Sequence, residues 1–461
     1  MFWGRERELA ELNRLYDTGK FQFPVVYGRR RVGKTALINE FVKDKPTIYF
    51  TGVETNEKQN LENFSKSIWN LKTGQETDAS FTSFQAALEY VFQLAEKEQL
   101  VLVVDEYPYV ARACQSLAST LQLLIDRNKD NSKLFLILCG SSMSFMEENV
   151  LAYKAPLYGR RTAQFKIRPF DFFETCVWYK DRDIFEQALL YGIVGGTPQY
   201  MLQMNPKVSV EENIKNNFLN PNSFLYEEPG NLLKQEVREP AIYNAIITAI
   251  ANGYSKLSEI SGKVGEETSV CATYIKNLVS LGIVKKETPY GEETTRKTIY
   301  SLEDNMFRFW YRFIPENSSA ITRGTTDLVY RRIEPHLNDY MGLVFEEICK
   351  QYLWKQLICG EIPVYFMDLG RFWGTNPKNR QQFEIDIMGA EDKDTALFGE
   401  CKWRNEKVDL DVLETLMERG NLFHFQNKYY YVFAKNGFTK RCMNKAAELG
   451  NIMLVSYQDM F

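Results

Sequence analysis

The stretch that decides the fold is FPVVYGRRRVGKTALINEF, residues 23–41. Its apolar start, residues 25–27, is typical of a buried strand, and residues 36–42 have the apolar spacing of a helix. The loop between them completes the pattern G-x-x-x-x-G-K-S/T in the strand–loop–helix setting that the motif requires. The stretch therefore predicts a phosphate-binding loop formed by Gly28, Arg29, Arg30, Arg31, Val32, Gly33, Lys34, Thr35 and Ala36.

The residue types of this loop suit a nucleoside triphosphate. Glycines let backbone N–H groups wrap around phosphate oxygens, and the N-terminus of the following helix adds favourable partial charge. We expect Lys34 to reach the β- and γ-phosphates and Thr35 to bind Mg²⁺. The alternative is a chance glycine loop that precedes a helix.

Composition narrows the class of protein. The 461 residues are enough for about two to four domains, and 44% apolar with 25% charged residues is typical of a soluble globular chain. No apolar run approaches the roughly 18 residues of a membrane span, and the N-terminus is charged too early for a secretory signal. Eight cysteines without a C-x-x-C pair indicate a reduced, cytoplasmic protein, and two histidines argue against histidine-based zinc chemistry. A net charge of −4 means that any nucleic-acid contact must come from local basic patches.

A second apolar run, residues 100–104, ends in the acidic pair Asp105 and Glu106. Carboxylates at the end of a buried strand are costly unless they face a cleft that contains a cation. We expect Asp105 to hold the Mg²⁺ shell and Glu106 to polarise the attacking water. The alternative, an acidic pair that caps a helix, is common, but the position after a buried strand favours the catalytic interpretation.

Two further segments carry weaker candidates. Ser141 and Ser142 follow the buried run 134–138 and could sense the γ-phosphate, or they form an ordinary turn. Arg160 and Arg161 could stabilise transition-state charge, from the same chain or from a neighbouring subunit of a homo-oligomer. Their alternative is a set of surface ion pairs.

Five segments together carry a family resemblance. They are GRRRVGKT, VDEYPY, CGSS, LYGRR and GGTPQY, in that order along the chain. Residues 2–204 resemble the prokaryotic ATPase family first described from archaea, a branch close to AAA+ and STAND NTPases. The resemblance implies ATP and Mg²⁺ as ligands, Ser141 or Ser142 as the sensor, Arg160 or Arg161 as the finger, and Pro198 as a lid residue near adenine.

The middle of the chain predicts a winged helix. Residues 208–239 are interpreted as lid helices and a connector, and three helices at 241–251, 257–264 and 269–281 precede two strands at 283–288 and 295–302. If this module binds DNA, the expected contacts are Thr273, Lys276, Asn277, Lys285, Lys286, Arg296 and Lys297. Acidic residues of the same hairpin, Glu287, Glu292 and Glu293, would repel a DNA backbone, and a packing module is the alternative.

The C-terminal part contains a second acidic pattern. Glu346 lies in a predicted helix at 342–357, and strands at 383–388 and 396–403 predict a hairpin that brings Asp386, Glu400 and Lys402 to one face. Two carboxylates and a lysine suit a hard cation and a phosphate. The pattern resembles the PD-(D/E)XK nuclease fold, which implies that Asp386, Glu400 and Glu346 bind Mg²⁺ and that Lys402 orients water. Ile385 stands where that motif has proline, and an ordinary charged hairpin is the alternative.

The complete prediction is an α/β protein with a parallel P-loop NTPase sheet and a helical lid at residues 1–235, a winged helix at 236–313, a linker at 314–330 and a restriction-endonuclease-like α/β domain at 331–461. The predicted function is ATP hydrolysis that controls a metal-dependent, nuclease-like site acting on DNA. The alternative is a STAND-type regulatory switch whose C-terminal domain binds a partner without cleaving it.

Overall fold

The computed structural model describes residues 2–73, 79–292, 295, 297–377 and 379–461. The chain divides into two compact units, Met1–Phe170 with Thr197–Gln199, and Asp171–Gly196 with Tyr200–Phe461. The predicted first domain, residues 1–235, is therefore longer than the first unit. The helices after residue 170 belong to the second unit because their apolar faces are buried there: Gly192, for example, packs against Met341.

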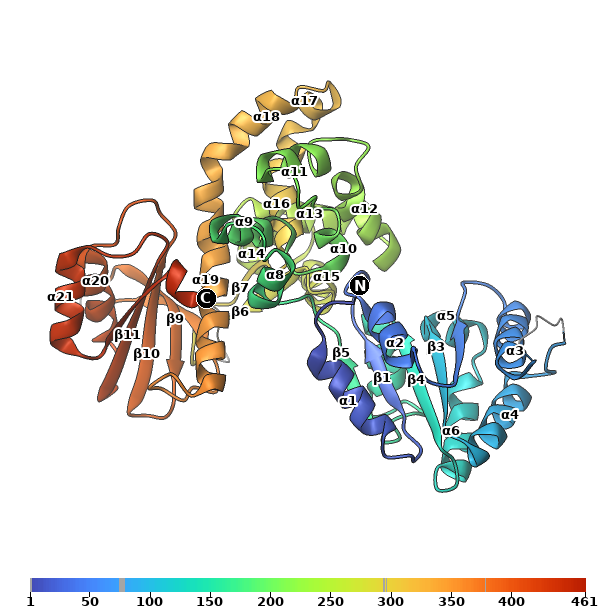
Figure 1. Cartoon of the computed structure of the whole chain (residues 1–461). Coiled ribbons are helices and arrows are strands. Elements are labelled where there is room, and N and C mark those ends of the chain that lie inside the picture. The colour runs from blue at the N-terminus through green and yellow to red at the C-terminus, as the bar shows by residue number, and fades with distance from the viewer. Residues whose placement is uncertain (1, 74–78, 293–294, 296, 378) are drawn as a thin grey trace. The chain divides into compact units, whose positions relative to one another are not determined.

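The first unit is built on a five-stranded sheet in the order β2-β3-β4-β1-β5, and every pairing in it is parallel. The strands are β1 (Pro24–Tyr27), β2 (Thr47–Thr51), β3 (Leu100–Asp105), β4 (Leu134–Gly140) and β5 (Ala163–Lys166). The helices are α1 (Glu6–Tyr16), α2 (Lys34–Val42), α3 (Glu57–Thr73), α4 (Phe84–Lys97), α5 (Tyr107–Ala113), α6 (Leu117–Asn128), α7 (Met143–Met146) and the π-helix η1 (Glu147–Leu151) (Figure 1). A parallel sheet was predicted and is confirmed.

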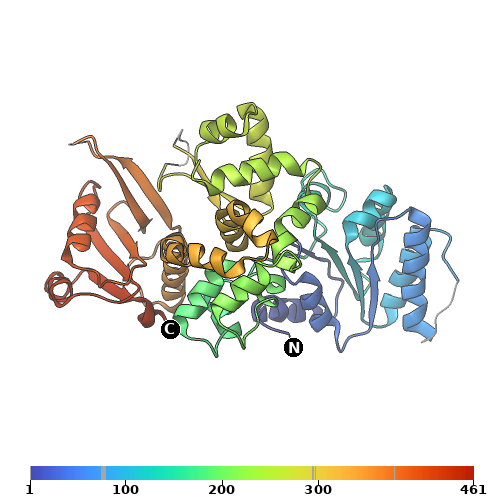
Figure 2. The same ribbon diagram turned by 90° about the horizontal axis from the view of Figure 1, so that it is seen from above.

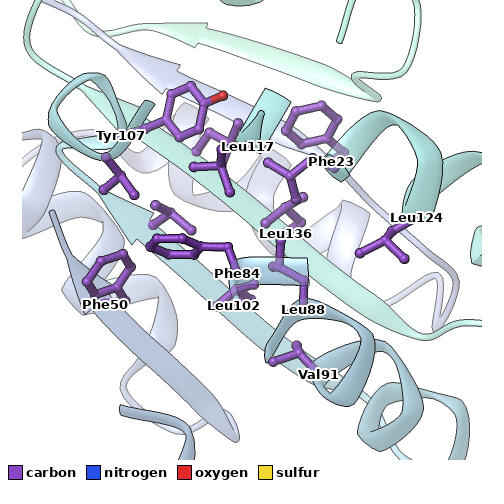
Figure 3. Packing of buried hydrophobic residues seen from close by; sticks show 14 of the residues in the cluster. Phe23, Phe50, Phe84, Leu88, Val91, Leu102, Tyr107, Leu117, Leu124 and Leu136 are labelled. Carbon is purple, nitrogen blue, oxygen red and sulfur yellow. The ribbon is translucent and has the colours of Figure 1, made fainter. Parts of the chain in front are cut away.

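Both faces of this sheet are covered, because alternate residues of each central strand enter different cores. One core packs the sheet against α3, α4, α5 and α6, and Figure 3 shows part of it, including Phe84, Leu102 and Leu136. The other core packs Val26, Val103 and further strand residues against α1 and α2. Parallel strands that are buried on both faces read as continuous apolar runs, which is why β3 and β4 were visible in the sequence.

The second unit begins with helices α8 (Phe172–Trp178), α9 (Ile184–Val194), α11 (Val210–Asn217) and α12 (Phe224–Glu236), while α10 (Pro198–Met201) spans the boundary between the units. Next come α13 (Pro240–Ala251), α14 (Leu257–Val264) and α15 (Thr268–Ser280), followed by an antiparallel hairpin of β6 (Val284–Glu287) and β7 (Ile299–Leu302). Helix α16 (Asn305–Phe313) is rich in aromatic residues, and its Phe309 packs against Phe218 and Tyr340.

The range predicted as a linker, residues 314–330, is helical instead. It contains η2 (Pro315–Asn317), α17 (Ser318–Thr322) and most of α18 (Thr326–Ile333). Ile321 and Val329 are 1% and 0% exposed, so this segment packs into the second unit as an ordinary amphipathic element. The prediction was wrong because Ser318, Ser319 and Thr322, three of the polar residues that suggested a linker, are the exposed positions of helix α17, whose Ile321 is buried.

The C-terminal part of the second unit contains a mixed sheet in the order β12-β11-β10-β9-β8. Its elements are η3 (Glu334–His336), α19 (Leu337–Cys359), β8 (Gly370–Thr375), β9 (Gln382–Ala390), β10 (Thr395–Lys402), α20 (Leu410–Gly420), β11 (Asn427–Ala434), α21 (Lys440–Leu449), β12 (Ile452–Ser456) and η4 (Tyr457–Met460). Strands β8, β9 and β10 pair antiparallel, and β10, β11 and β12 pair parallel. Helices α20 and α21 cover one face, and α19 contacts the other through Tyr352 and Phe433 (Figures 1 and 2).

Two smaller results complete the fold. Among the helices formed by the described residues, none is both long and apolar enough to span a membrane. The predicted DNA contact Arg296 and the acidic residue Glu293 lie outside the described residues.

Candidate functional site

The loop after β1 has a backbone that only certain residues can follow. A Cβ atom on Gly28 would lie 2.3 Å from the carbonyl oxygen of Ile167, so the close approach of the two chains requires glycine. Gly33 precedes α2 with φ +89°, a left-handed conformation that also favours glycine. Arg31 adopts φ 74° without being glycine, which is a local strain of the kind that gathers at functional sites.

Lys34 and Arg29 hold this loop together. Lys34 is buried, and its Nζ donates a hydrogen bond to the carbonyl oxygen of Arg29 at 2.9 Å. Arg29 in turn donates from Nη2 to Thr197 Oγ1 at 2.6 Å. The neighbouring Pro198 lies beside Gly33, 3.7 Å from the position that a Cβ atom would occupy there. The structure thus places Pro198 beside the loop, and its role as a lid residue near adenine stays a prediction.

The carboxylate of Asp105 lies opposite Thr35 at the carboxyl end of β3. Thr35 Oγ1 donates to Asp105 Oδ2 at 3.1 Å, and the Glu106 backbone N–H donates to Asp105 Oδ1 at 2.9 Å. Asp105 is 4% exposed, whereas Thr35 is exposed. A threonine hydroxyl and a carboxylate in contact beside a helix N-terminus are the donor set that Mg²⁺ and a triphosphate require, so the residues fit these ligands.

Glu106 stands between β3 and α5 in a left-handed conformation, with φ 50°. Its Oε2 accepts a hydrogen bond from Ser141 Oγ at 2.9 Å, and Ser141 lies at the end of the neighbouring strand β4. Ser142, the predicted sensor, is one residue further and precedes α7. Of the two serines that the sequence left open, Ser141 is therefore the one that contacts the acidic pair.

The two candidate arginines bind elsewhere in the first unit. Arg160 forms an ion pair with Asp126, with Nη2 and Oδ2 2.6 Å apart, and also donates to the Pro156 carbonyl. Arg161 donates to the carbonyl of Leu151 at 3.3 Å. For Arg160 this is the surface ion pair that the sequence analysis named as the alternative. The assignment of Arg160 or Arg161 as a finger, in the same chain or from a neighbouring subunit, stays a prediction.

Three contacts of this site had no signal in the sequence. The Tyr49 hydroxyl donates to Asp105 Oδ2 at 2.9 Å, and burial next to that carboxylate raises the pKa of Tyr49. Arg30 donates to the hydroxyl of Tyr109 at 2.9 Å, and Thr197 accepts from Arg29 as described above. Each joins residues that are far apart in sequence, and polar residues of these types occur everywhere along the chain.

The C-terminal acidic residues do gather around β9 and β10. Lys402 Nζ lies 2.6 Å from Glu400 Oε1, and Arg419 Nη1 lies 3.4 Å from Glu400 Oε2. Asp386 Oδ2 accepts the backbone N–H of Cys401 at 2.8 Å. Arg419, on α20, is the member of this group that the sequence analysis missed.

Burial and like charge change the proton affinity of two of these carboxyls. Burial, with the Asp386 charge nearby, raises the pKa of Glu346 to about 7. The same two causes raise the pKa of Glu400, against the opposing effect of Lys402. Two carboxyl groups that resist ionisation here are the expected result of placing three acids in a partly desolvated space.

These residues do not form a ready metal site. No group of three or more His, Cys, Asp or Glu side chains that could hold a metal ion exists within the described part of the chain. The role of Glu346, Asp386 and Glu400 as a Mg²⁺ ligand set stays a prediction. Lys402 and Arg419 lie against the two oxygens of Glu400, and the Cys401 amide donates to Oδ2 of Asp386.

The predicted DNA contacts of the β6–β7 hairpin are also largely engaged. Lys285 pairs with Glu287 at 3.0 Å and with Glu347 at 3.9 Å, and Lys297 pairs with Glu292 at 2.7 Å. On α15, Asn277 donates to the hydroxyl of Tyr243 at 2.7 Å. Lys276 and Lys286 are exposed.

Comparison with known families and structures agrees with the geometry of the first unit. Residues 2–204 match the model described as an ATPase domain predominantly from Archaea, and residues 310–413 match one described as archaeal and bacterial proteins of unknown function. The "walker-type atpase paby2304" of Pyrococcus abyssi aligns with a TM-score of 0.53 at 18% identity and covers 68% of this chain and 96% of its own. That similarity shows the fold.

Two relatives come from Methanocaldococcus jannaschii. "Uncharacterized ATP-binding protein MJ0423" is 47% identical over 45 residues, which are 10% of this chain and 76% of that protein. "Uncharacterized protein MJECL04" is 32% identical over 473 residues, and the match covers 100% of both chains. The chain therefore belongs to the family that includes MJECL04, and its first 204 residues contain an ATPase domain of the archaeal type.

Proposed function

We propose that this ATPase binds ATP with Mg²⁺ at residues 28–36, hydrolyses it, and uses its nucleotide state to control a DNA-acting site in the C-terminal part of the chain. The observation that supports ATP binding and hydrolysis is a chain of hydrogen bonds that runs from Thr35 through Asp105 and Glu106 to Ser141. These hydrogen bonds join the loop to the ends of β3 and β4, where ligands of open parallel sheets bind.

Each residue of this site has a proposed role. Lys34 and the loop amides hold the phosphates, and Thr35 with Asp105 holds Mg²⁺, which supplies charge neutralisation when bound. Glu106 orients the attacking water, and its bond to Ser141 fixes the carboxylate until substrate arrives. Pro198 would lie near the adenine base.

To test ATP binding and hydrolysis, three variants are compared in a thermal-shift assay and a phosphate-release assay. We expect Lys34→Ala to lose the stabilisation by Mg·ATP, because the cation that holds the phosphates is gone. We expect Glu106→Gln to keep that stabilisation and to lose about a hundredfold in hydrolysis rate, the size of a general-base contribution. The matched control is Lys20→Ala, an exposed lysine of the same unit, which should behave as wild type. An unchanged shift in Lys34→Ala would refute the placement of the phosphates.

For the C-terminal site we propose recognition of a DNA phosphodiester. Lys402 and Arg419 are cations on two different elements that meet at one buried carboxylate, and both have the chemistry to bind a phosphate. Asp386 and Glu346 add the acidic groups of a nuclease-like site. No step is assigned to a metal here, because the carboxylates do not form a metal-binding group in the described residues.

A second candidate function is a regulatory switch that binds a partner through the C-terminal part without cleaving it. The observation that favours this alternative is the pairing of both Glu400 oxygens with cations, which leaves this carboxylate no oxygen without a cationic partner. In this case the ATPase unit would hydrolyse ATP slowly, and the hydrolysis rate would set how long the switch stays in its ATP-bound state. The winged-helix-like module would have a structural role in packing.

One experiment separates the two candidates. Plasmid and single-stranded DNA are incubated with the full chain, ATP and either Mg²⁺ or Mn²⁺, beside the variants Glu400→Ala and Lys402→Ala. Cleavage that falls at least tenfold in both variants, with ATP hydrolysis preserved, supports the nuclease-like function. Absence of cleavage by wild type, with ATP hydrolysis intact, supports the switch.

A further inference from the structure

The hydroxyl of Tyr49 is a third donor to Asp105 that the proposed roles do not use. Asp105 Oδ2 accepts from Tyr49 at 2.9 Å as well as from Thr35 at 3.1 Å, and Oδ1 accepts the Glu106 amide at 2.9 Å. The three donors come from β2, α2 and the turn after β3, so the carboxylate is held from three separate elements.

The packing of the Tyr49 ring does not explain why this residue carries a hydroxyl group. The aromatic ring packs against the core formed by the sheet, α1 and α2, and a phenylalanine ring would fill the same space. Tyr49 pairs with Val103 across the β2–β3 ladder, two residues before Asp105, and its hydroxyl extends along the strands to the carboxylate. A phenolic hydroxyl is protonated at physiological pH, so Tyr49 acts as the donor in this hydrogen bond.

A carboxylate turns easily about its terminal bond, because such torsions have broad minima. Two donors on opposite oxygens remove this freedom. The Glu106 amide holds Oδ1 whatever else binds, but Thr35 is the proposed Mg²⁺ ligand and its hydroxyl must serve that role as well. Tyr49 also donates to Oδ2 and is not among the proposed Mg²⁺ ligands, so we expect its bond to remain when Thr35 binds Mg²⁺.

We propose that Tyr49 is a positioning residue that fixes the Asp105 carboxylate for Mg²⁺, and that it sets the Mg²⁺ affinity of the nucleotide site without contributing to affinity for the nucleotide itself. The inference rests on the proposed function, in which Thr35 and Asp105 hold Mg²⁺. It adds a residue of β2 to a site otherwise built from the loop and the ends of β3 and β4.

The test measures binding of a fluorescent ATP analogue to Tyr49→Phe, first in EDTA and then as Mg²⁺ is titrated. In EDTA we expect the affinity of wild type within a factor of two. In the titration we expect the half-saturating Mg²⁺ concentration to rise about tenfold, the effect of one hydrogen bond to a charged group. The matched control is Tyr107→Phe: the buried hydroxyl of Tyr107 has no hydrogen-bond partner among the described residues, so its removal should change neither quantity.

A double-mutant comparison separates positioning from a general effect on the fold. In an Asp105→Asn background, Tyr49→Phe should cause no further rise in half-saturating Mg²⁺, because the charged group that it positions is already gone. An unchanged Mg²⁺ requirement in Tyr49→Phe, an equal loss of affinity in EDTA, or a full additional rise in the Asp105→Asn background would each overturn the inference. Failure of the wild type to bind the analogue at all would instead contradict the proposed function.

Discussion

At the scale of single residues, the two candidate sites differ in how their acids are held. Asp105 is surrounded by hydrogen-bond donors, and Glu106 accepts the hydroxyl of Ser141 from a strained left-handed backbone position. Such strain persists only where the surrounding structure enforces it, and it gathers at functional sites. Glu346, in contrast, is a half-buried carboxyl whose pKa is raised to about 7 by burial and by Asp386.

The raised pKa of Glu346 predicts a pH-dependent stability. Folding raises this pKa above its ordinary 4.5, so the folded state retains a proton that the unfolded state loses between pH 4.5 and about 7. The contribution of Glu346 to the free energy of unfolding therefore decreases as pH rises through this window, by about 3 kcal/mol in total. Urea unfolding at pH 5 and pH 8 should show Glu346→Gln gaining stability relative to wild type at the higher pH.

The control for this measurement is Glu414→Gln, an exposed glutamate of α20, which should differ from wild type equally at both pH values. A difference between Glu346→Gln and wild type that stays constant from pH 5 to pH 8 would contradict the assignment.

At the scale of elements, the β6–β7 hairpin is anchored to the C-terminal sheet. The backbone N–H of Tyr290, in the connection between the two strands, donates to the carbonyl of Arg371 on β8 at 2.9 Å. The Tyr290 hydroxyl accepts the backbone N–H of Ala390 on β9 at 2.9 Å, and its ring packs against Gly370. These contacts hold the hairpin against the C-terminal sheet, as the packing alternative predicts, and its contact with DNA stays a prediction.

The anchorage predicts a local effect of Tyr290→Phe. The substitution leaves the ring in place but removes the acceptor of the Ala390 amide, and a half-buried donor left without a partner costs about 1 to 2 kcal/mol. Hydrogen exchange measured by mass spectrometry should accelerate about tenfold or more at residues 388–391. The same measurement on Tyr365→Phe, an exposed tyrosine of the second unit, should match wild type, and unchanged exchange in Tyr290→Phe would exclude the anchor.

At the scale of the whole molecule, the chain passes between its two units three times, at residues 170–171, 196–197 and 199–200. The short segment Thr197–Gln199 belongs to the first unit although both of its neighbours belong to the second. It contacts the phosphate-binding loop through Arg29 and Thr197, and through the Gln199 amide and the carbonyl of Arg31. This segment is therefore hydrogen-bonded to the phosphate-binding loop and continuous in the chain with the second unit at both of its ends.

The sequence by itself determined the phosphate-binding loop, the acidic pair after β3 and the parallel sheet, because these depend on short motifs and on continuous apolar runs. It also determined that Asp386, Glu400 and Lys402 share one part of a hairpin, because side chains of a strand alternate with a period of two. It did not predict β5, whose four residues are only partly buried and have no apolar run.

Only the tertiary structure decided which polar groups meet. Tyr49 and Asp105 are separated by 56 residues, Glu106 and Ser141 by 35, and Arg29 and Thr197 by 168, and no local pattern encodes such pairs. The same holds for Arg419 on α20, which pairs with Glu400 on β10 although the two residues are 19 positions apart. The local sequence determines whether a segment forms a helix, a strand or a loop. The register and packing of distant elements determine which charged side chains pair with one another.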